Sequence, residues 1–155
     1  MARYKFEVTY LQNEDIRISA RDRVTSELYG YVQISSSLNL EKKELIEIAQ
    51  LYVISNKRGS GLGSILTSRA IEYALKINKG IHMLIQPGSE GFWKKYFNAR
   101  FNGKRMTLLG GETLNSKLYE GAVFEISMMS LIRNYKFPLD KELRLPGVER
   151  ACRIV

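Results

Sequence analysis

The sequence predicts a single α/β domain built on a mixed, mostly antiparallel sheet. Three observations support this prediction: four strand-like segments come first, a glycine-rich turn opens an amphipathic helix, and a short buried strand follows that helix. A strand, a helix and a strand in succession form a βαβ unit, so its two strands should be parallel. With 155 residues, 45% of them hydrophobic, the chain can form one domain with its own core.

The first four strands are predicted from alternation and from β-branched residues. The segments 3–11, 16–24 and 29–38 alternate, and turn residues separate the first two. One face of the first segment carries Tyr4, Phe6, Val8 and Tyr10. The segment 44–55 is mostly apolar, which is typical of a central strand buried on both faces.

The helix of the βαβ unit is predicted over 64–79, because apolar residues recur there about once per turn. Gly80 is expected to end this helix. The segment 81–86 then reads as a short buried strand that lies parallel to 44–55.

The remaining chain completes the domain. The segment 89–101 has a second helical pattern, and 104–111 and 119–132 are expected to form a closing pair of strands. The tail 134–155 contains two prolines and has no clear period. No repeat or linker divides the sequence, so we expect one domain over 1–155.

Positive charge is concentrated in the middle of the chain. The whole sequence has a formal net charge of +8, and residues 51–110 alone contain 10 Lys/Arg against 2 Asp/Glu. Such a field attracts phosphates, nucleic acid or acidic proteins, unless it only serves solubility. The single cysteine, Cys152, excludes an internal disulfide and a cysteine-cluster metal site. No apolar run reaches the ~18 residues of a membrane helix, and no signal peptide is recognisable, so we expect no membrane partner and a cytoplasmic location.

The turn between the central strand and the helix contains three alternating glycines, Gly59, Gly61 and Gly63. Glycine permits positive φ angles and lets a ligand approach the backbone. The helix that follows adds unsatisfied N–H groups and the positive end of its dipole. The turn is therefore a candidate site for a phosphate or pyrophosphate, although a plain tight turn would also use glycine.

Two common phosphate motifs do not fit this turn. The P-loop pattern is absent. The dinucleotide pattern is met only loosely, by Gly59, Gly61 and Ser64. It also requires an acidic residue at the end of the next strand, where this sequence has Gln86.

The segment Arg58-Gly59-Ser60-Gly61-Leu62-Gly63 matches the pattern [QR]-x-x-G-x-[GA] and resembles the acetyl-CoA-binding motif of the GNAT family of N-acetyltransferases. Two further matches are Tyr96 followed five residues later by Phe101, and the segment 29–32 that begins the preceding strand. The family usually has glycine before that phenylalanine, whereas this chain has Arg100. The resemblance covers roughly 29–101.

The resemblance implies a GNAT fold, in which the central parallel strands splay apart and helices cover both faces of the sheet. It implies that acetyl-CoA is the co-substrate, with its pantetheine arm in the gap between these strands. The N–H of Val53 would bond the thioester carbonyl. The implied cofactor-binding residues are Leu51, Tyr52, Val53, Arg58, Gly59, Ser60, Gly61, Leu62, Gly63 and Ser64.

Acetyl transfer to an amine needs a proton acceptor and a proton donor. The resemblance to histone-type members implies that Glu47 is the base. The alternatives are a solvent-facing glutamate and a chain of waters in place of one base. Tyr96 matches the family's tyrosine, which the resemblance implies to be the acid that protonates the thiolate; the alternative is a core aromatic residue. His82, the only histidine, is a residue of the core or of a sheet face, or a proton relay on the substrate side.

In the family, two helices between the first two strands wall the acceptor site, but here only a few residues link these strands. The wall would then come from the tail or from the second subunit of a homodimer. An open face favours an amine on a macromolecule, such as a protein or aminoacyl-RNA. Two alternatives stay open: transfer of a longer acyl group, and an inactive basic protein that binds nucleic acid or an acidic partner.

Overall fold

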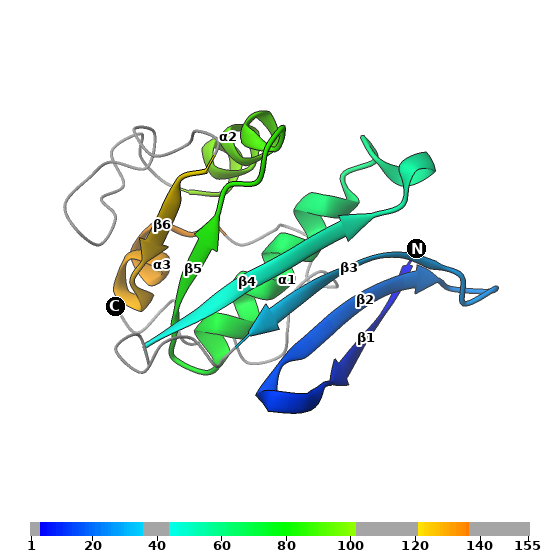
Figure 1. The fold of residues 1–155 in the computed structure, drawn as a ribbon, viewed down its shortest axis with the longest axis horizontal. Coiled ribbons are helices and arrows are strands. Elements are labelled where there is room, and N and C mark those ends of the chain that lie inside the picture. Colours follow the sequence, from blue (N-terminus) through cyan, green and yellow to red (C-terminus); the bar gives the residue numbers. More distant parts are fainter. Residues whose placement is uncertain (1–3, 36–43, 102–120, 137–155) are drawn as a thin grey trace.

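The computed structural model describes residues 4–35, 44–101 and 121–136. Their strands form one six-stranded sheet in the order β1-β2-β3-β4-β5-β6 (Figure 1). The strands are β1 Tyr4–Tyr10, β2 Ile16–Asp22, β3 Leu28–Ser35, β4 Leu45–Val53, β5 Gly80–Leu84 and β6 Val123–Ile126. Neighbouring strands are antiparallel except β4 and β5, which are parallel as the βαβ prediction requires.

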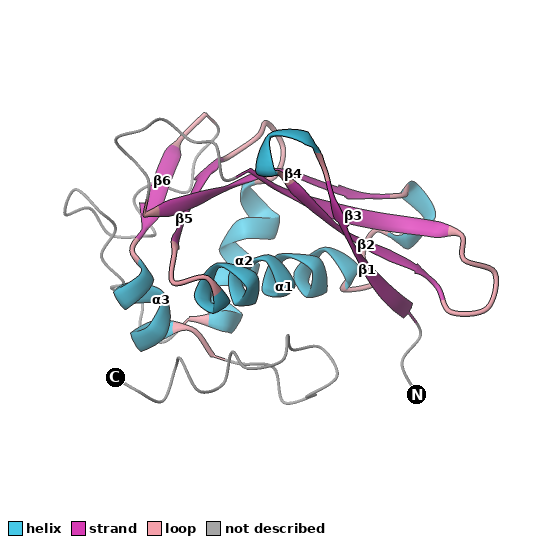
Figure 2. Ribbon diagram, turned by 90° about the horizontal axis from the view of Figure 1, so that it is seen from below, coloured by secondary structure: helices cyan, strands magenta, loops and turns pink. Residues whose placement is uncertain are grey.

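Three α-helices pack on one side of this sheet (Figure 2). They are α1 Leu62–Lys76, α2 Glu90–Arg100 and α3 Met128–Asn134; two 3₁₀ turns, η1 Gln12–Glu14 and η3 Ser55–Lys57, complete the described elements. The mixed α/β fold class is confirmed. The implied helices on the second face are not seen among the described residues, because β1 and β2 are joined by little more than η1.

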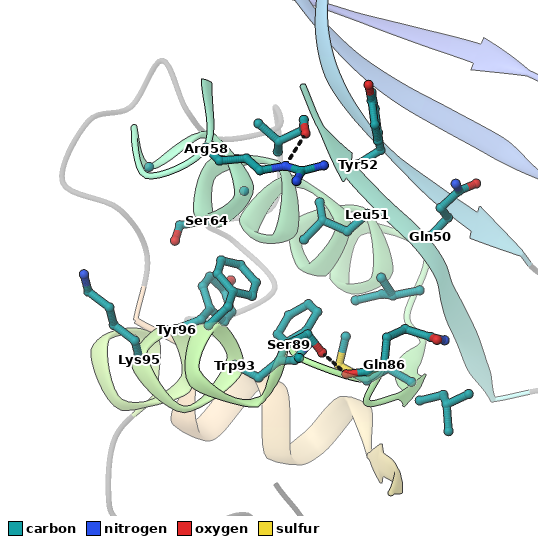
Figure 3. Close-up of a pocket in the computed structure, with 18 of the residues that line it drawn as sticks. Gln50, Leu51, Tyr52, Arg58, Ser64, Gln86, Ser89, Trp93, Lys95 and Tyr96 are labelled. Atoms are coloured by element: carbon teal, nitrogen blue, oxygen red, sulfur yellow. Dashed lines mark hydrogen bonds between the residues drawn. The ribbon is translucent and has the colours of Figure 1, made fainter. Parts of the chain in front are cut away.

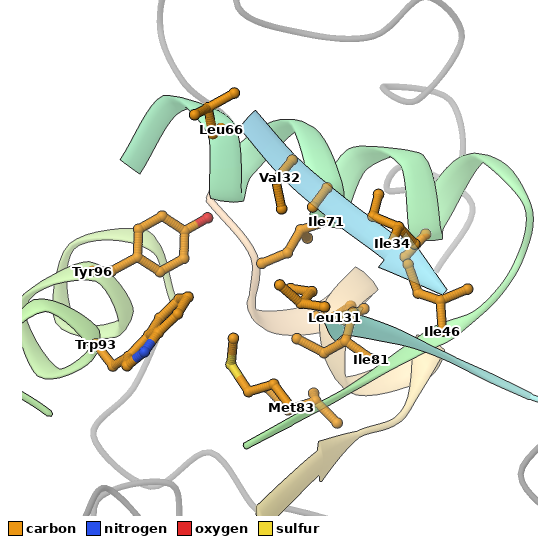
Figure 4. Packing of buried hydrophobic residues seen from close by; sticks show 14 of the residues in the cluster. Val32, Ile34, Ile46, Leu66, Ile71, Ile81, Met83, Trp93, Tyr96 and Leu131 are labelled. Carbon is orange, nitrogen blue, oxygen red and sulfur yellow. The ribbon is translucent and has the colours of Figure 1, made fainter. Parts of the chain in front are cut away.

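The core lies between the sheet and α1. Successive side chains of a strand point to opposite faces, so alternate residues of β3, β4 and β5 meet the helix. Figure 4 shows this layer. Its fully buried members include Val32, Ile34, Ile46, Leu66, Ile71, Ile81 and Met83.

The prediction that 44–55 is buried on both faces is wrong for its second half. Leu45, Ile46 and Ile48 are buried, but Ala49, Gln50 and Tyr52 are exposed. The reason is that no described helix covers the sheet face opposite α1, which we call the outer face. The end of β1 is also open, since Tyr10 is 78% exposed.

The closing strands were predicted only in part. The segment 119–132 divides into β6 and α3, so Met128 and Met129 lie on a helix and not on a strand. Ser127 caps α3, because its hydroxyl accepts a hydrogen bond from the Ser130 N–H at 3.1 Å. The predicted strand 104–111 lies outside the described residues, as does all of the predicted tail after 136.

Gly80 has a different role from the predicted one. The helix ends at Lys76, and Asn78 takes the left-handed conformation (φ 58°) that closes it. Gly80 already belongs to β5. A Cβ at this position would lie 2.2 Å from the Ile126 carbonyl oxygen and 2.7 Å from the Leu45 side chain. Gly80 therefore lets β5 pack closely at the start of the parallel pair.

Gly80→Ala should destabilise the fold by about 2–3 kcal/mol, because backbone atoms must move to admit the methyl group. Urea denaturation would measure this loss. Gly91→Ala is the matched control, because a Cβ on Gly91 meets no atom within 4 Å and helices favour alanine. Equal stability of the two variants would contradict the packing role of Gly80.

Candidate active site

A cleft of about 820 Å³ lies where β4, the glycine turn, the end of β5 and α2 meet (Figure 3). Ten of the twelve predicted site residues line it: Glu47, Leu51, Tyr52, Val53, Arg58, Gly59, Gly61, Gly63, Ser64 and Tyr96. The other two do not line it. Leu62 is fully buried in the core, and the Ser60 hydroxyl donates to the Lys57 carbonyl.

The glycine turn has the backbone form of an anion site. Gly59 and Gly61 have φ angles of 81° and 89°, and a Cβ on either would meet no atom within 4 Å. Packing therefore does not require glycine at these positions, but the backbone conformation does. Gly61 precedes the first turn of α1, and no side chain caps that helix. Its first N–H groups are thus available to a ligand in the cleft.

Gly63 differs from the other two glycines. It lies within α1, and a Cβ there would come 3.3 Å from the Phe92 ring of α2. The absence of a side chain at Gly63 therefore lets α1 and α2 approach each other. Arg58 also has a structural contact, because its Nε donates to the Val53 carbonyl oxygen at 2.9 Å. This bond ties the glycine turn to the end of β4.

The backbone of β4 presents hydrogen-bonding groups to the cleft. The Ile54 N–H donates to the Tyr29 carbonyl, towards β3. Because successive N–H groups of a strand point to opposite edges, those of Leu51 and Val53 point away from β3. The edge they face is the one from which β5 has separated. An extended ligand can therefore pair with Leu51 and Val53 as an added strand.

β4 and β5 pair over only three residues and then diverge (Figure 1). The last pair is Glu47 with His82. Just beyond it, β4 has an irregularity in its pairing with β3, where Ile34 faces Ile48 and Gln33 faces Gln50. Such a bulge bends the strand. The apex of the gap is thus at Glu47 and His82, and the implied splay is present.

Glu47 and Val53 lie too far apart to act on one carbonyl group. Six residues along a strand span roughly 20 Å. With the glycine turn near Val53, a ligand that binds the turn by its phosphates would extend along β4 towards Glu47. The reactive end would then lie beside Leu51 or deeper. Leu51 lies nearer to Glu47 than Val53 does, although four residues, roughly 13 Å along the strand, still separate Leu51 from Glu47.

Tyr96 lines the cleft but is almost wholly buried, with 2% of its surface exposed. Its hydroxyl lies 3.0 Å from Ser68 Oγ on α1. Burial raises the pKa of the Tyr96 hydroxyl well above its ordinary value, with a further rise from Tyr135. The hydroxyl therefore stays protonated and can donate a hydrogen bond.

One pairing was not predicted from the sequence. His82 Nδ1 lies 2.9 Å from Glu125 Oε2 on β6. His82 stands out in the sequence as the only histidine, but no local pattern relates it to Glu125, which lies 43 positions away.

The model of the acetyltransferase (GNAT) family matches residues 3–98. A search of curated proteins gave no match. Among solved structures, the chain resembles a chimera of Vibrio cholerae SpeG spermidine N-acetyltransferase and hSSAT (TM-score 0.53, 19% identity, 79% of this chain and 71% of that one). It also resembles an acyl-CoA N-acyltransferase from Pseudomonas aeruginosa (TM-score 0.51, 16% identity, 76% and 71%).

A third similar structure is described as a candidate acetyltransferase from Acinetobacter baylyi (TM-score 0.53, 18% identity, 75% of this chain). This chain spans 65% of the length of that protein. No helix among the described residues is long and apolar enough to cross a membrane. At these identities the solved structures support the fold, and the family model covers more than half of the sequence. The chain belongs to the GNAT family of acetyltransferases.

Proposed function

We propose that this protein is an N-acetyltransferase that moves an acetyl group from acetyl-CoA to a primary amine. The observation that carries the proposal is one continuous cleft, which joins an uncapped helix N-terminus at Gly61 to the gap between β4 and β5. The CoA pyrophosphate would bind the backbone of residues 58–63. The pantetheine arm would pair with Leu51 and Val53, and the Leu51 N–H would stabilise the oxyanion.

In this proposal Glu47 is the proton acceptor, at the apex of the gap. It lines the cleft, and within the described residues no hydrogen bond or ion pair engages its carboxylate. It can therefore receive an ammonium group. Tyr96 donates a hydrogen bond, and then a proton, to the departing sulfur. The raised pKa of Tyr96 keeps its hydroxyl protonated, so it can donate a hydrogen bond to the developing thiolate; the proton that it then gives up is replaced by the one that leaves the acceptor nitrogen.

The acceptor approaches from the outer face of the sheet. Tyr52 is 38% exposed there and packs on Tyr31, with ring centroids 5.4 Å apart. No described helix encloses this surface, so its shape suits a flexible amine on a macromolecule. Protein N-termini and lysine side chains are the acceptors to test first. Spermidine belongs in the same panel, since it tests whether a small polyamine is accepted.

Calorimetric titration with acetyl-CoA, with NADH as the control ligand, tests the cofactor site. We expect acetyl-CoA to bind and NADH not to bind. Release of CoA thiol in the presence of the amine panel then tests transfer. Failure to bind acetyl-CoA would overturn the proposal and direct attention to the exposed lysines of α2, Lys94 and Lys95, as a basic surface for nucleic acid. Octanoyl-CoA in the same assay tests for a longer acyl group.

A further inference from the structure

We propose that His82 and Glu125 are positioning residues that carry the acceptor's proton away from Glu47. This inference rests on the proposed function, since it assigns a path to the proton that acetyl transfer releases. Glu47, His82 and Glu125 would form one row across three strands, with His82 in the middle. Glu47 and His82 are paired in register but are not hydrogen-bonded to each other, so the proton would pass from Glu47 to His82 Nε2 through a bridging water or after the two side chains approach, and then to water at the outer face.

Strand register places the three residues in this row. Glu47 of β4 pairs with His82 of β5, and His82 pairs with Glu125 of β6. Paired residues on adjacent strands point to the same face, and the strands lie about 4.8 Å apart. The neighbouring pair Ile46 and Ile81 is fully buried on the α1 side. The row of acidic residues and histidine therefore belongs to the outer face, where the amine arrives.

The contact with Glu125 determines which nitrogen of His82 is available. Glu125 Oε2 lies 2.9 Å from Nδ1, so in the neutral imidazole Nδ1 carries the hydrogen and donates it to the carboxylate. Nε2 is then the lone-pair nitrogen. Both side chains are largely shielded, with 16% of His82 and 21% of Glu125 exposed. Shielding strengthens this hydrogen bond and holds the ring in one orientation.

The row of Glu47, His82 and Glu125 lies at the apex of the cleft, where the reaction would take place. β4 and β5 separate directly after Glu47 and His82, so these are the last paired residues before the ligand gap. Of the two, Glu47 lines the cleft. Glu47 therefore meets the acceptor, and His82 stands behind it. A carboxylate that keeps the proton cannot act in the next turnover, and a neutral imidazole beside it can accept that proton.

Acetyl transfer takes two protons from the ammonium group of the acceptor. The ammonium group gives one proton to Glu47, which passes it to His82 Nε2. The nitrogen lone pair forms the C–N bond to the acetyl carbon, and the C–S bond breaks with its electron pair on sulfur. The second proton leaves the nitrogen and reaches the sulfur by way of Tyr96. The products are an amide and the CoA thiol, and the imidazolium releases its proton to water.

The first test is spectroscopic and needs no acceptor. His82 is the only histidine, so its ring nitrogens give an unambiguous ¹⁵N signal in the labelled protein. We expect the neutral ring to carry its hydrogen on Nδ1, and Glu125→Ala to return it to the Nε2–H form. We expect Glu47→Gln to move the Nε2 resonance, because the new amide can donate to it, and Glu44→Gln to leave it unchanged. An Nε2–H ring in the unmutated protein, or an Nε2 signal insensitive to Glu47→Gln, would overturn the proposal.

The second test is a double-mutant comparison with acetyl-CoA and n-butylamine. His82→Gln should lower kcat about tenfold in the unmutated background, while the amine KM and the acetyl-CoA affinity stay within twofold. In the Glu47→Gln background, His82→Gln should alter kcat less than twofold, because no proton reaches His82 once the Glu47 carboxylate is absent. Imidazole added to the assay should partly restore the kcat of the His82→Ala variant.

The outcomes separate the two proposals. If the unmutated protein transfers acetyl groups, and His82→Gln lowers kcat equally in both backgrounds, the relay proposal is overturned. The acetyltransferase proposal then stands. Absence of transfer to every amine of the panel overturns the acetyltransferase, and the relay with it. Non-additive losses of kcat in the two backgrounds, together with a His82 ring that carries its hydrogen on Nδ1, support both the acetyltransferase and the relay.

Discussion

Gly61→Arg is expected to weaken acetyl-CoA binding at least 100-fold, a loss of about 2.7 kcal/mol of binding free energy. Gly61 has a φ of 89° and borders the cleft directly before α1. An arginine here would strain the backbone and fill the space in front of the helix N–H groups. The positive charge of the introduced arginine would by itself attract a pyrophosphate. A loss of acetyl-CoA binding must therefore come from blocked access to the helix N–H groups and from the altered backbone.

Gly121→Arg is the matched control for this variant. Gly121 has a φ of 81°, is exposed and does not line the cleft. Both substitutions should therefore cost a similar 1–3 kcal/mol of folding stability. Calorimetry should show normal acetyl-CoA binding for Gly121→Arg only. Undiminished binding by Gly61→Arg would refute the assignment of the glycine turn as the pyrophosphate site.

Tyr96→Phe is expected to reduce kcat at least tenfold and to leave acetyl-CoA affinity within twofold. A proton donor acts on the departing sulfur, whose charge develops only in the transition state, so its loss affects turnover more than binding. The substitution also breaks the hydrogen bond to Ser68, which should cost about 1 kcal/mol of stability. Stability alone therefore cannot identify the role of this hydroxyl.

Ser68→Ala separates the two effects. It removes the same hydrogen bond but keeps the Tyr96 hydroxyl. We expect Ser68→Ala to lose a similar amount of stability in urea denaturation while kcat stays within threefold. If the two variants lose activity equally, Tyr96 is a buried core tyrosine, and the departing thiolate takes its proton from water.

Local patterns in the sequence were sufficient for the βαβ unit and the glycine turn. Apolar periodicity identified α1 and α2 to within two residues at their starts, and the order of elements required β4 and β5 to be parallel. The motif from Arg58 to Gly63 predicted the left-handed glycines that the turn has at Gly59 and Gly61, while phosphate binding there stays a prediction. These features depend on residues close together in sequence, whose effect on the backbone is the same wherever the segment packs.

Patterns failed where packing, not periodicity, determines the structure. The apolar run 119–132 has no distinct period, and the Ser127 cap begins a helix within it. The second half of β4 is apolar enough to suggest complete burial, yet Gln50 and Tyr52 face outwards, since no described helix covers that face. A short apolar segment gives the same pattern in both environments.

What the sequence determined by itself is the family fold, the glycine turn that we propose as the anion site, and the identity of the candidate residues Glu47, Tyr96 and His82. Only the tertiary structure decided how they relate. Register across β4, β5 and β6 aligned His82 between Glu47 and Glu125, and the early end of β4–β5 pairing placed the apex of the gap beside them. The physical reason is that strand pairing joins residues far apart in the chain through backbone hydrogen bonds, which carry no local sequence signature.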